Sequence, residues 1–169
     1  MSKSVATRPV VMDPLSLASP LAVPVRFVLG VAGGILAVLA MDVVMARLPE
    51  GKTPPFVAAG VLTEAHPDDA PARLAAVVHY VAGLLTAPLF VWLLFASEAL
   101  FGGVSPAATA AAAAVLYVLM VGFFVVVVLP RSRVGADRVP AIRRDWALAA
   151  VAYLVVLVPL VVLGSRLIG

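Results

Sequence analysis

The chain contains no cysteine, and this absence excludes disulfides, thiolate metal ligands and thiol catalysis. Charge is also scarce: Asp, Glu, Lys and Arg make up 12% of the 169 residues, against about 25% in a typical soluble domain. Hydrophobic residues reach 63%, and the mean hydropathy is +1.13. A soluble fold of this composition would leave much apolar surface in water, so the sequence indicates a membrane protein.

Four apolar runs fill most of the sequence. Crossing the roughly 30 Å hydrocarbon core of a bilayer takes about 20 apolar residues in an α-helix. We therefore predict an all-α integral membrane protein, a four-transmembrane-helix bundle with spans at residues 26–48, 74–100, 107–129 and 146–165. They form one domain, 26–169, after a flexible N-terminal tail, 1–25. Because the first run is long and contains Asp42, we do not expect a cleavable signal peptide.

The connection between the first two spans contains a shorter apolar stretch, residues 56–62. It is too short to cross a membrane, and the Thr53-Pro54 pair before it is typical of a helix start. We predict a short interfacial helix in this loop; an ordinary loop that touches the bundle is the alternative. Ser105 followed by Pro106 predicts the N-terminal cap of the third span, and Trp146 has the position of an interfacial aromatic residue.

The basic residues are distributed unevenly between the two sides of such a bundle. The first and third loops carry three and five Lys or Arg residues, whereas the N-terminal tail, the second loop and the C-terminus carry three, none and one. Cytoplasmic loops carry the excess of positive charge in membrane proteins. We therefore expect a multi-pass protein of the cell membrane with both termini outside and both long loops in the cytoplasm.

Two ionisable residues lie well inside the predicted spans, Asp42 in the first and His79 in the second. A charge inside a membrane costs about 2.5–3.5 kcal/mol on insertion scales, so such residues usually have a partner or a function. Each lies about six residues, or ~9 Å of helix rise, from the connection between the two spans. The two side chains therefore share a depth. Three interpretations remain open: a pair that binds a proton, ion or ligand, a pair that fixes helix packing, or no direct contact.

Further polar residues gather at this same end of the predicted bundle. They predict a polar vestibule or a set of lipid contacts, made of Arg47, Tyr80, Arg131, Arg133, Arg143, Arg144 and Asp145. Glycines predict close helix packing: Gly30 and Gly34 are four residues apart, and Gly83 lies one turn after His79. For the first two glycines, a homodimer face is the alternative.

The sequence lacks the signature motifs of several classes of protein. There is no glycine-rich phosphate loop, no Ser/His/Asp set and no metalloprotease helix motif, so we expect no enzymatic activity, no cofactor and no metal site. A metal bridging His66, Asp68 and Asp69 is a minor alternative, and so is a dimer binding haem between two copies of His79. The basic residues flank apolar spans, which favours membrane lipid over nucleic acid as their partner.

Residues 40–56, Ala-Met-Asp-Val-Val-Met-Ala-Arg-Leu-Pro-Glu-Gly-Lys-Thr-Pro-Pro-Phe, are followed by His-Tyr-Val-Ala-Gly at 79–83. These segments resemble small uncharacterised four-span membrane proteins of halophilic archaea. The resemblance covers about residues 26–129 and implies an archaeal cell-membrane location. It implies no activity for Asp42 or His79.

Taken together, these features favour a non-enzymatic, structural or accessory subunit of a larger membrane complex, or a homo-oligomer. The alternative is a small proton- or ion-coupled transporter or channel that uses Asp42 and His79.

Overall fold

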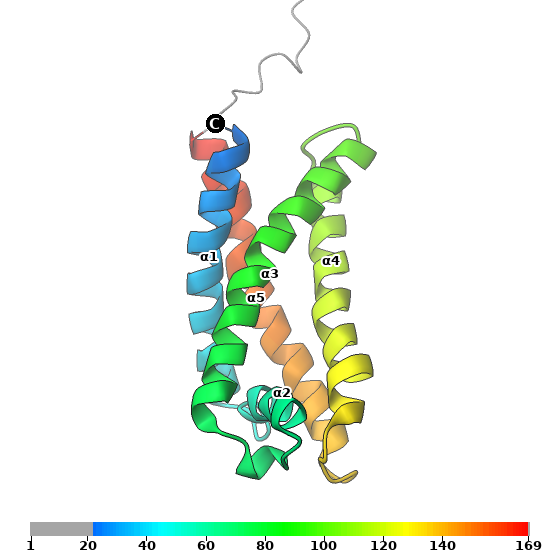
Figure 1. Ribbon diagram of the computed structural model, residues 1–169. Helices are drawn as coiled ribbons and strands as arrows, with labels where there is room; N and C mark the ends of the chain where they lie inside the picture. The colour runs from blue at the N-terminus through cyan, green and yellow to red at the C-terminus, as the bar shows by residue number, and fades with distance from the viewer. Residues whose placement is uncertain (1–21, 169) are drawn as a thin grey trace, which may run out of the picture.

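The computed structural model describes residues 22–168, and these form five α-helices (Figure 1). The helices are α1 (Ala22–Met45), α2 (Thr53–Thr63), α3 (Ala72–Leu100), α4 (Pro106–Phe123) and α5 (Val139–Ile168). α4 continues through a π-helical turn, Phe124–Val128, and a 3-10 turn, Leu129–Arg131. With these extensions, α1, α3, α4 and α5 are each long and apolar enough to cross a membrane. The predicted all-α fold with four helices of spanning length is confirmed.

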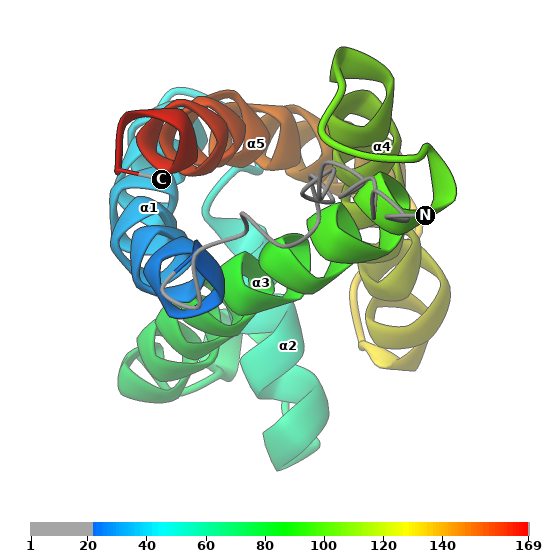
Figure 2. The ribbon, with the colours of Figure 1, turned by 90° about the horizontal axis from the view of Figure 1, so that it is seen from above.

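The four long helices form one bundle in which α3 and α5 cross. Figure 1 shows α3 running obliquely in front of α5, with α1 on one side of the crossing and α4 on the other. Seen from above, the four helices surround a common centre (Figure 2). α1 packs against α5 and α3, and α4 packs against α3 and α5. α2 lies across the end of the bundle away from the C-terminus.

The helix ends follow local sequence signals in part. Ser105 caps α4 by accepting a hydrogen bond from the Ala108 amide at 3.1 Å. α2 begins at Thr53, so the predicted short helix is confirmed and the loop alternative is wrong. α5, however, begins at Val139 rather than near residue 146, because the charged segment before the apolar run is itself helical. The predicted tail lies outside the described residues except for 22–25, which belong to α1.

Small residues allow α1 and α3 to approach closely. A Cβ atom added to Gly34 would lie 2.5 Å from Cβ of Ala87 and 3.7 Å from the Gly83 carbonyl oxygen. A Cβ added to Gly83 would lie 2.9 Å from Cγ2 of Val38, and one added to Gly30 would lie 2.8 Å from Cγ2 of Val91. The three predicted packing glycines therefore lie at one intramolecular contact, and Gly30 and Gly34 face α3 of the same chain.

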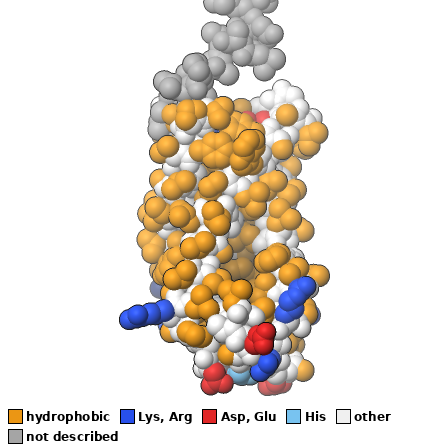
Figure 3. All heavy atoms as spheres, in the orientation of Figure 1, with side chains coloured by type: hydrophobic (Ala, Val, Ile, Leu, Met, Phe, Trp, Pro, Cys, Tyr) orange, Lys and Arg blue, Asp and Glu red, His pale blue; other side chains and the backbone are white. Residues whose placement is uncertain are grey.

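α2 is anchored in the bundle by two fully buried side chains. Val57 packs with Phe124, Leu129 and Ile142, which joins α2 to the end of α4 and the start of α5. Pro54 is also fully buried. In Figure 3, hydrophobic side chains cover the body of the molecule, and charged side chains gather chiefly at the end that holds α2.

Candidate functional site

The acid and the histidine that were predicted to lie inside the spans are in direct contact. Oδ1 of Asp42 lies 2.7 Å from Nε2 of His79, and the hydroxyl of Tyr80 donates to Oδ2 of Asp42 at 2.8 Å. The His79 side chain is 8% exposed and that of Asp42 is 32% exposed. Both carboxylate oxygens are therefore occupied by neighbours on α3. The interpretation without direct contact is wrong. Tyr80, which was predicted as part of the vestibule, is instead the third member of this polar cluster.

This cluster forms where it does because the close α1–α3 contact continues to the ends of the two helices. Asp42 is in the last turn of α1, and His79 and Tyr80 lie in the second and third turns of α3. The chain reverses between them through α2, so the two helices run antiparallel. Side chains at matching depth then meet, as the sequence pattern predicts.

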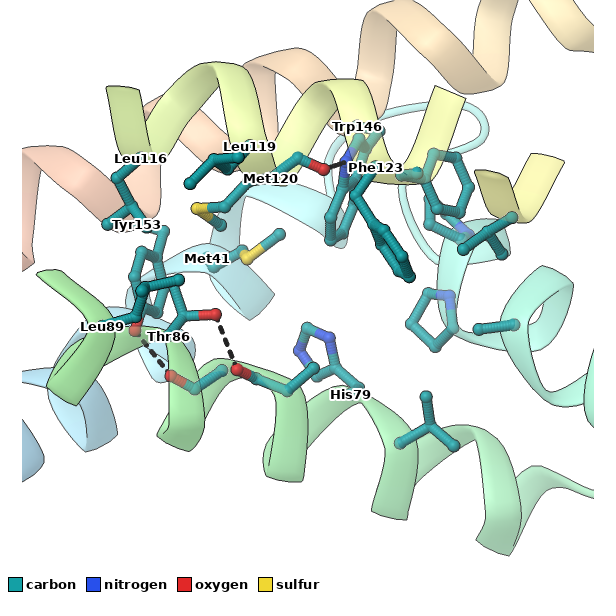
Figure 4. Close-up of a pocket in the computed structure, with 18 residues that line it drawn as sticks. Met41, His79, Thr86, Leu89, Leu116, Leu119, Met120, Phe123, Trp146 and Tyr153 are labelled. Carbon is teal, nitrogen blue, oxygen red and sulfur yellow. Dashed lines mark hydrogen bonds between the residues drawn. The ribbon is translucent and has the colours of Figure 1, made fainter. Parts of the chain in front are cut away.

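His79 also borders a cavity of about 390 Å³ between α3 and α4. Figure 4 shows its imidazole projecting from α3 into this space, toward Met41 and Phe123. α2 closes the cavity at the charged end, and α1 and α5 form its back wall. The eighteen lining residues are Met41, Pro54, Pro55, Ala58, Val78, His79, Ala82, Gly83, Thr86, Leu89, Leu116, Leu119, Met120, Phe123, Phe124, Val128, Trp146 and Tyr153. The cavity is therefore almost entirely apolar, and its volume lies within the range of small-molecule sites, roughly 300–1,000 Å³.

The few polar groups of the lining besides His79 donate to backbone carbonyls. The Thr86 hydroxyl donates to the carbonyl of Ala82 at 2.7 Å. Tyr153 donates across the bundle to Gly83 at 2.6 Å, and Trp146 donates to Met120 at 3.2 Å (Figure 4). Trp146 thus forms a half-buried wall of the cavity.

The predicted polar vestibule does not form around the pair. Arg47 and Arg131 are exposed and donate to carbonyls of their own helices, those of Val43 and Val127. Arg133, Arg143 and Arg144 are exposed as well. Asp145, by contrast, is completely buried and accepts from the Glu50 amide at 2.8 Å and from Arg144 at 2.9 Å. These arginines therefore lie on the outside of the charged end.

A second ionic cluster is centred on Arg138, which the sequence analysis did not single out. Arg138 donates to both carboxylate oxygens of Glu50 at 2.9 Å and to Asp68 at 3.1 Å and 3.2 Å. The Thr53 hydroxyl also donates to Glu50, at 2.5 Å. Hydrogen bonds from Arg138 lower the pKa of Glu50 below its ordinary value against the opposing effect of burial, and Glu50 and then Asp68 raise the pKa of Arg138. This cluster ties both ends of α2 to the start of α5.

A separate ion pair lies at the opposite end of the bundle. Arg26 of α1 donates to Glu98 of α3 at 2.6 Å, with both side chains less than one-fifth exposed. The Arg26 guanidinium also lies 5.0 Å from the ring centroid of Phe95. Between this pair and the Asp42–His79 pair, the core is formed by apolar side chains and Tyr153.

A metal bridging His66, Asp68 and Asp69 was the minor alternative in this loop, and the structure shows a capping role for His66. Nδ1 of His66 accepts from the Asp68 amide at 3.3 Å, which caps the 3-10 turn Pro67–Asp69. Within residues 22–168, no group of three or more His, Cys, Asp or Glu side chains is placed to hold a metal ion. No protein-family model, curated protein or solved structure matches this chain.

Proposed function

We propose that this chain is a non-enzymatic, multi-pass membrane protein that binds a lipophilic molecule in the cavity between α3 and α4. The cavity itself is the observation that carries the proposal. Its walls are apolar, and Figure 3 shows a hollow on this face of the molecule, within the hydrophobic surface. An apolar cavity of this size that stayed empty would lose dispersion contacts along its whole lining. A molecule from the hydrocarbon phase restores those contacts.

The binding role is tested by filling the cavity. Ala82 lines it, whereas Ala96 lies on α3 outside the lining and is exposed. Purification of wild type, Ala82→Phe and Ala96→Phe in mild detergent is followed by mass spectrometry of the retained lipophiles. We expect a defined compound to remain with wild type and Ala96→Phe, and to be lost from Ala82→Phe. Retention of the bulk lipid mixture by all three proteins would contradict the proposal.

We further propose that the protein acts as an accessory subunit of a larger membrane complex. The exposed sides of α1 and α4 support this, since they carry large apolar side chains such as Val28, Leu39, Val115 and Val118 that suit a neighbour within the membrane. The same purification tests the assignment, because a stoichiometric larger protein should accompany the chain. A homo-oligomer without any partner would argue against it.

Proton or ion coupling is the second candidate, and one observation favours it. Through His79, the Asp42 carboxylate is linked to the cavity by a single imidazole, and an imidazole can accept a proton on one ring nitrogen and release one from the other. In that case, proteoliposomes should show a pH-dependent flux that Asp42→Asn abolishes. Equal leakage from wild-type, variant and protein-free vesicles would remove this candidate.

We propose that the end carrying α2 faces the cytoplasm, with both termini outside the cell. Its support is the excess of Lys and Arg in the first and third loops. Because the chain has no native cysteine, single cysteines report topology directly. We expect Ala136→Cys, in the loop before α5, to be protected from an impermeant thiol reagent in intact cells, and Val104→Cys, in the loop before α4, to react. The reverse pattern would invert the orientation.

A further inference from the structure

The hydrogen-bonding groups that line the cavity are nearly all acceptors. The three lining side chains with a hydroxyl or indole hydrogen donate it to backbone carbonyls: Thr86 to Ala82, Tyr153 to Gly83 and Trp146 to Met120. Their donors are therefore committed. The oxygens of Thr86 and Tyr153 keep lone pairs, because a hydroxyl that donates once can still accept.

His79 adds the strongest acceptor to this lining. The Asp42 carboxylate accepts on both oxygens, one from Tyr80 and one from the imidazole. Because an ionised carboxylate can only accept, the contact with Asp42 selects the neutral tautomer of His79 that carries its hydrogen on Nε2. Nδ1 then presents a lone pair. Within the described residues, Nδ1 of His79 has no hydrogen-bond partner. Every fully buried side-chain nitrogen or oxygen in this part of the chain does have a partner, so Nδ1 is not fully buried. The free nitrogen therefore remains accessible on a ring that borders the cavity.

From this arrangement we infer that the cavity selects a lipophilic alcohol or phenol, whose hydroxyl donates to Nδ1 of His79. The inference rests on the proposed binding function and specifies its ligand class. A ketone, ester or ether of the same shape carries acceptors only and finds no free donor among the described lining residues. A hydroxyl compound satisfies His79 and keeps its apolar body against α3 and α4. The Asp42–His79 contact thus has a positioning role, since it determines which imidazole nitrogen carries the hydrogen and which is left to accept from the ligand.

The two tryptophans of the chain allow a direct binding measurement. Trp146 lines the cavity, whereas Trp92 lies on α3 outside the lining and is 64% exposed. A Trp92→Phe background leaves Trp146 as the single fluorescent reporter. This protein in nanodiscs is titrated with farnesol and, as a shape-matched probe without a donor, farnesyl methyl ether. We expect farnesol to bind at least about 5-fold more tightly, the equivalent of one net hydrogen bond.

Variants of the polar cluster connect this preference to His79. In the same background, His79→Phe should bind both probes equally, with the folded state checked by size-exclusion chromatography. Should that variant not fold, Asp42→Asn serves instead, because the amide keeps a hydrogen bond to the ring but no longer dictates which nitrogen carries the hydrogen; the preference for farnesol should shrink. Thr86→Val, which removes only a secondary acceptor, should reduce the preference less.

The possible failures are distinguishable. If both probes change Trp146 emission with equal affinity in wild type, the cavity binds lipophiles without selecting a hydroxyl, and only the present inference falls. A preference for farnesol that survives in His79→Phe would likewise overturn it. If neither probe binds and no lipophile is retained on purification, the proposed binding function itself fails.

Discussion

The two faces of α3 show how differently adjacent helix contacts can be built. Toward α1, the contact is closed: Gly30, Gly34 and Gly83 bring the helices so near that an added methyl group would collide. Toward α4, the same helix leaves a cavity of about 390 Å³. The difference follows from the residues at each contact and from α2, which inserts Pro54 and Val57 beside the ends of α3 and α4.

This comparison assigns separate tasks to the two contacts. In a bilayer, helix association depends on close packing and on polar contacts between helices, since lipid is as apolar as the side chains. The closed contact supplies both, through its glycines and the Asp42–His79 hydrogen bond. The open contact contributes less packing and is therefore the part of the bundle that can take up another molecule.

The largest effect is expected from overpacking the closed contact. Gly34→Leu would place its Cβ 2.5 Å from that of Ala87, so the helices must separate; we expect a loss of about 3 kcal/mol in the free energy of unfolding, and a matching loss of folded protein on size-exclusion chromatography. Gly122→Leu is the control, because nothing lies within 4 Å of a Cβ at Gly122 on α4. Equal damage by both substitutions would remove the contrast between the two contacts.

A smaller effect is expected where one side chain serves both contacts. Tyr153 borders the cavity and donates to the carbonyl of Gly83, within the α1–α3 contact. Tyr153→Phe keeps the ring and loses one hydrogen bond, so we expect a destabilisation of about 1 kcal/mol in thermal unfolding. Tyr117→Phe is the control: Tyr117 lies in the groove between α4 and α5, and within residues 22–168 its hydroxyl makes no hydrogen bond, so the unfolding temperature should stay unchanged. A stable Tyr153→Phe protein would show that packing alone holds α5 against α3.

The smallest effect concerns the ions that hold α2 beside the open contact. Arg138 lowers the pKa of Glu50 in the folded protein, so this contact stabilises the fold above the ordinary carboxyl pKa of 4.5 and is lost as the pH falls through the lowered value. Glu50→Gln should cost about 1 kcal/mol or less at pH 7. It should also flatten the decline in unfolding temperature between pH 6 and pH 3. An unchanged pH profile would show that other carboxylates dominate the acid response.

Much of the closed contact could be predicted from the sequence. Span positions follow from apolar run length, and the depths of Asp42 and His79 follow from their equal distance to the first connection. The spacing of Gly30 and Gly34 predicts a close approach, which the structure places against α3. Each of these signals is local and repeats with the helix period, so it can be read without knowing how the helices assemble.

The open contact and the charged end could not be predicted in this way. The cavity depends on where α2 lies, and the Arg138 cluster joins residues from three separate parts of the chain. Asp145 resembles any loop acid in sequence, and its complete burial becomes evident only once α5 is seen to begin at Val139. Trp146 likewise donates to the carbonyl of Met120 on α4, a contact between helices that the sequence alone does not reveal.

The neighbourhood of α1 and α5 has a consequence for biosynthesis. Within residues 22–168, the first and last helices pack against each other, and α5 supplies the buried side chains of Ala149, Tyr153, Leu157 and Val161. During translation the chain emerges from its N-terminus, so a nascent protein with three helices inserted still exposes the inner faces of α1 and α3 to lipid. The core of residues 22–168 is therefore completed only when α5 has been synthesised, and a chain truncated before Val139 would leave this core unfinished.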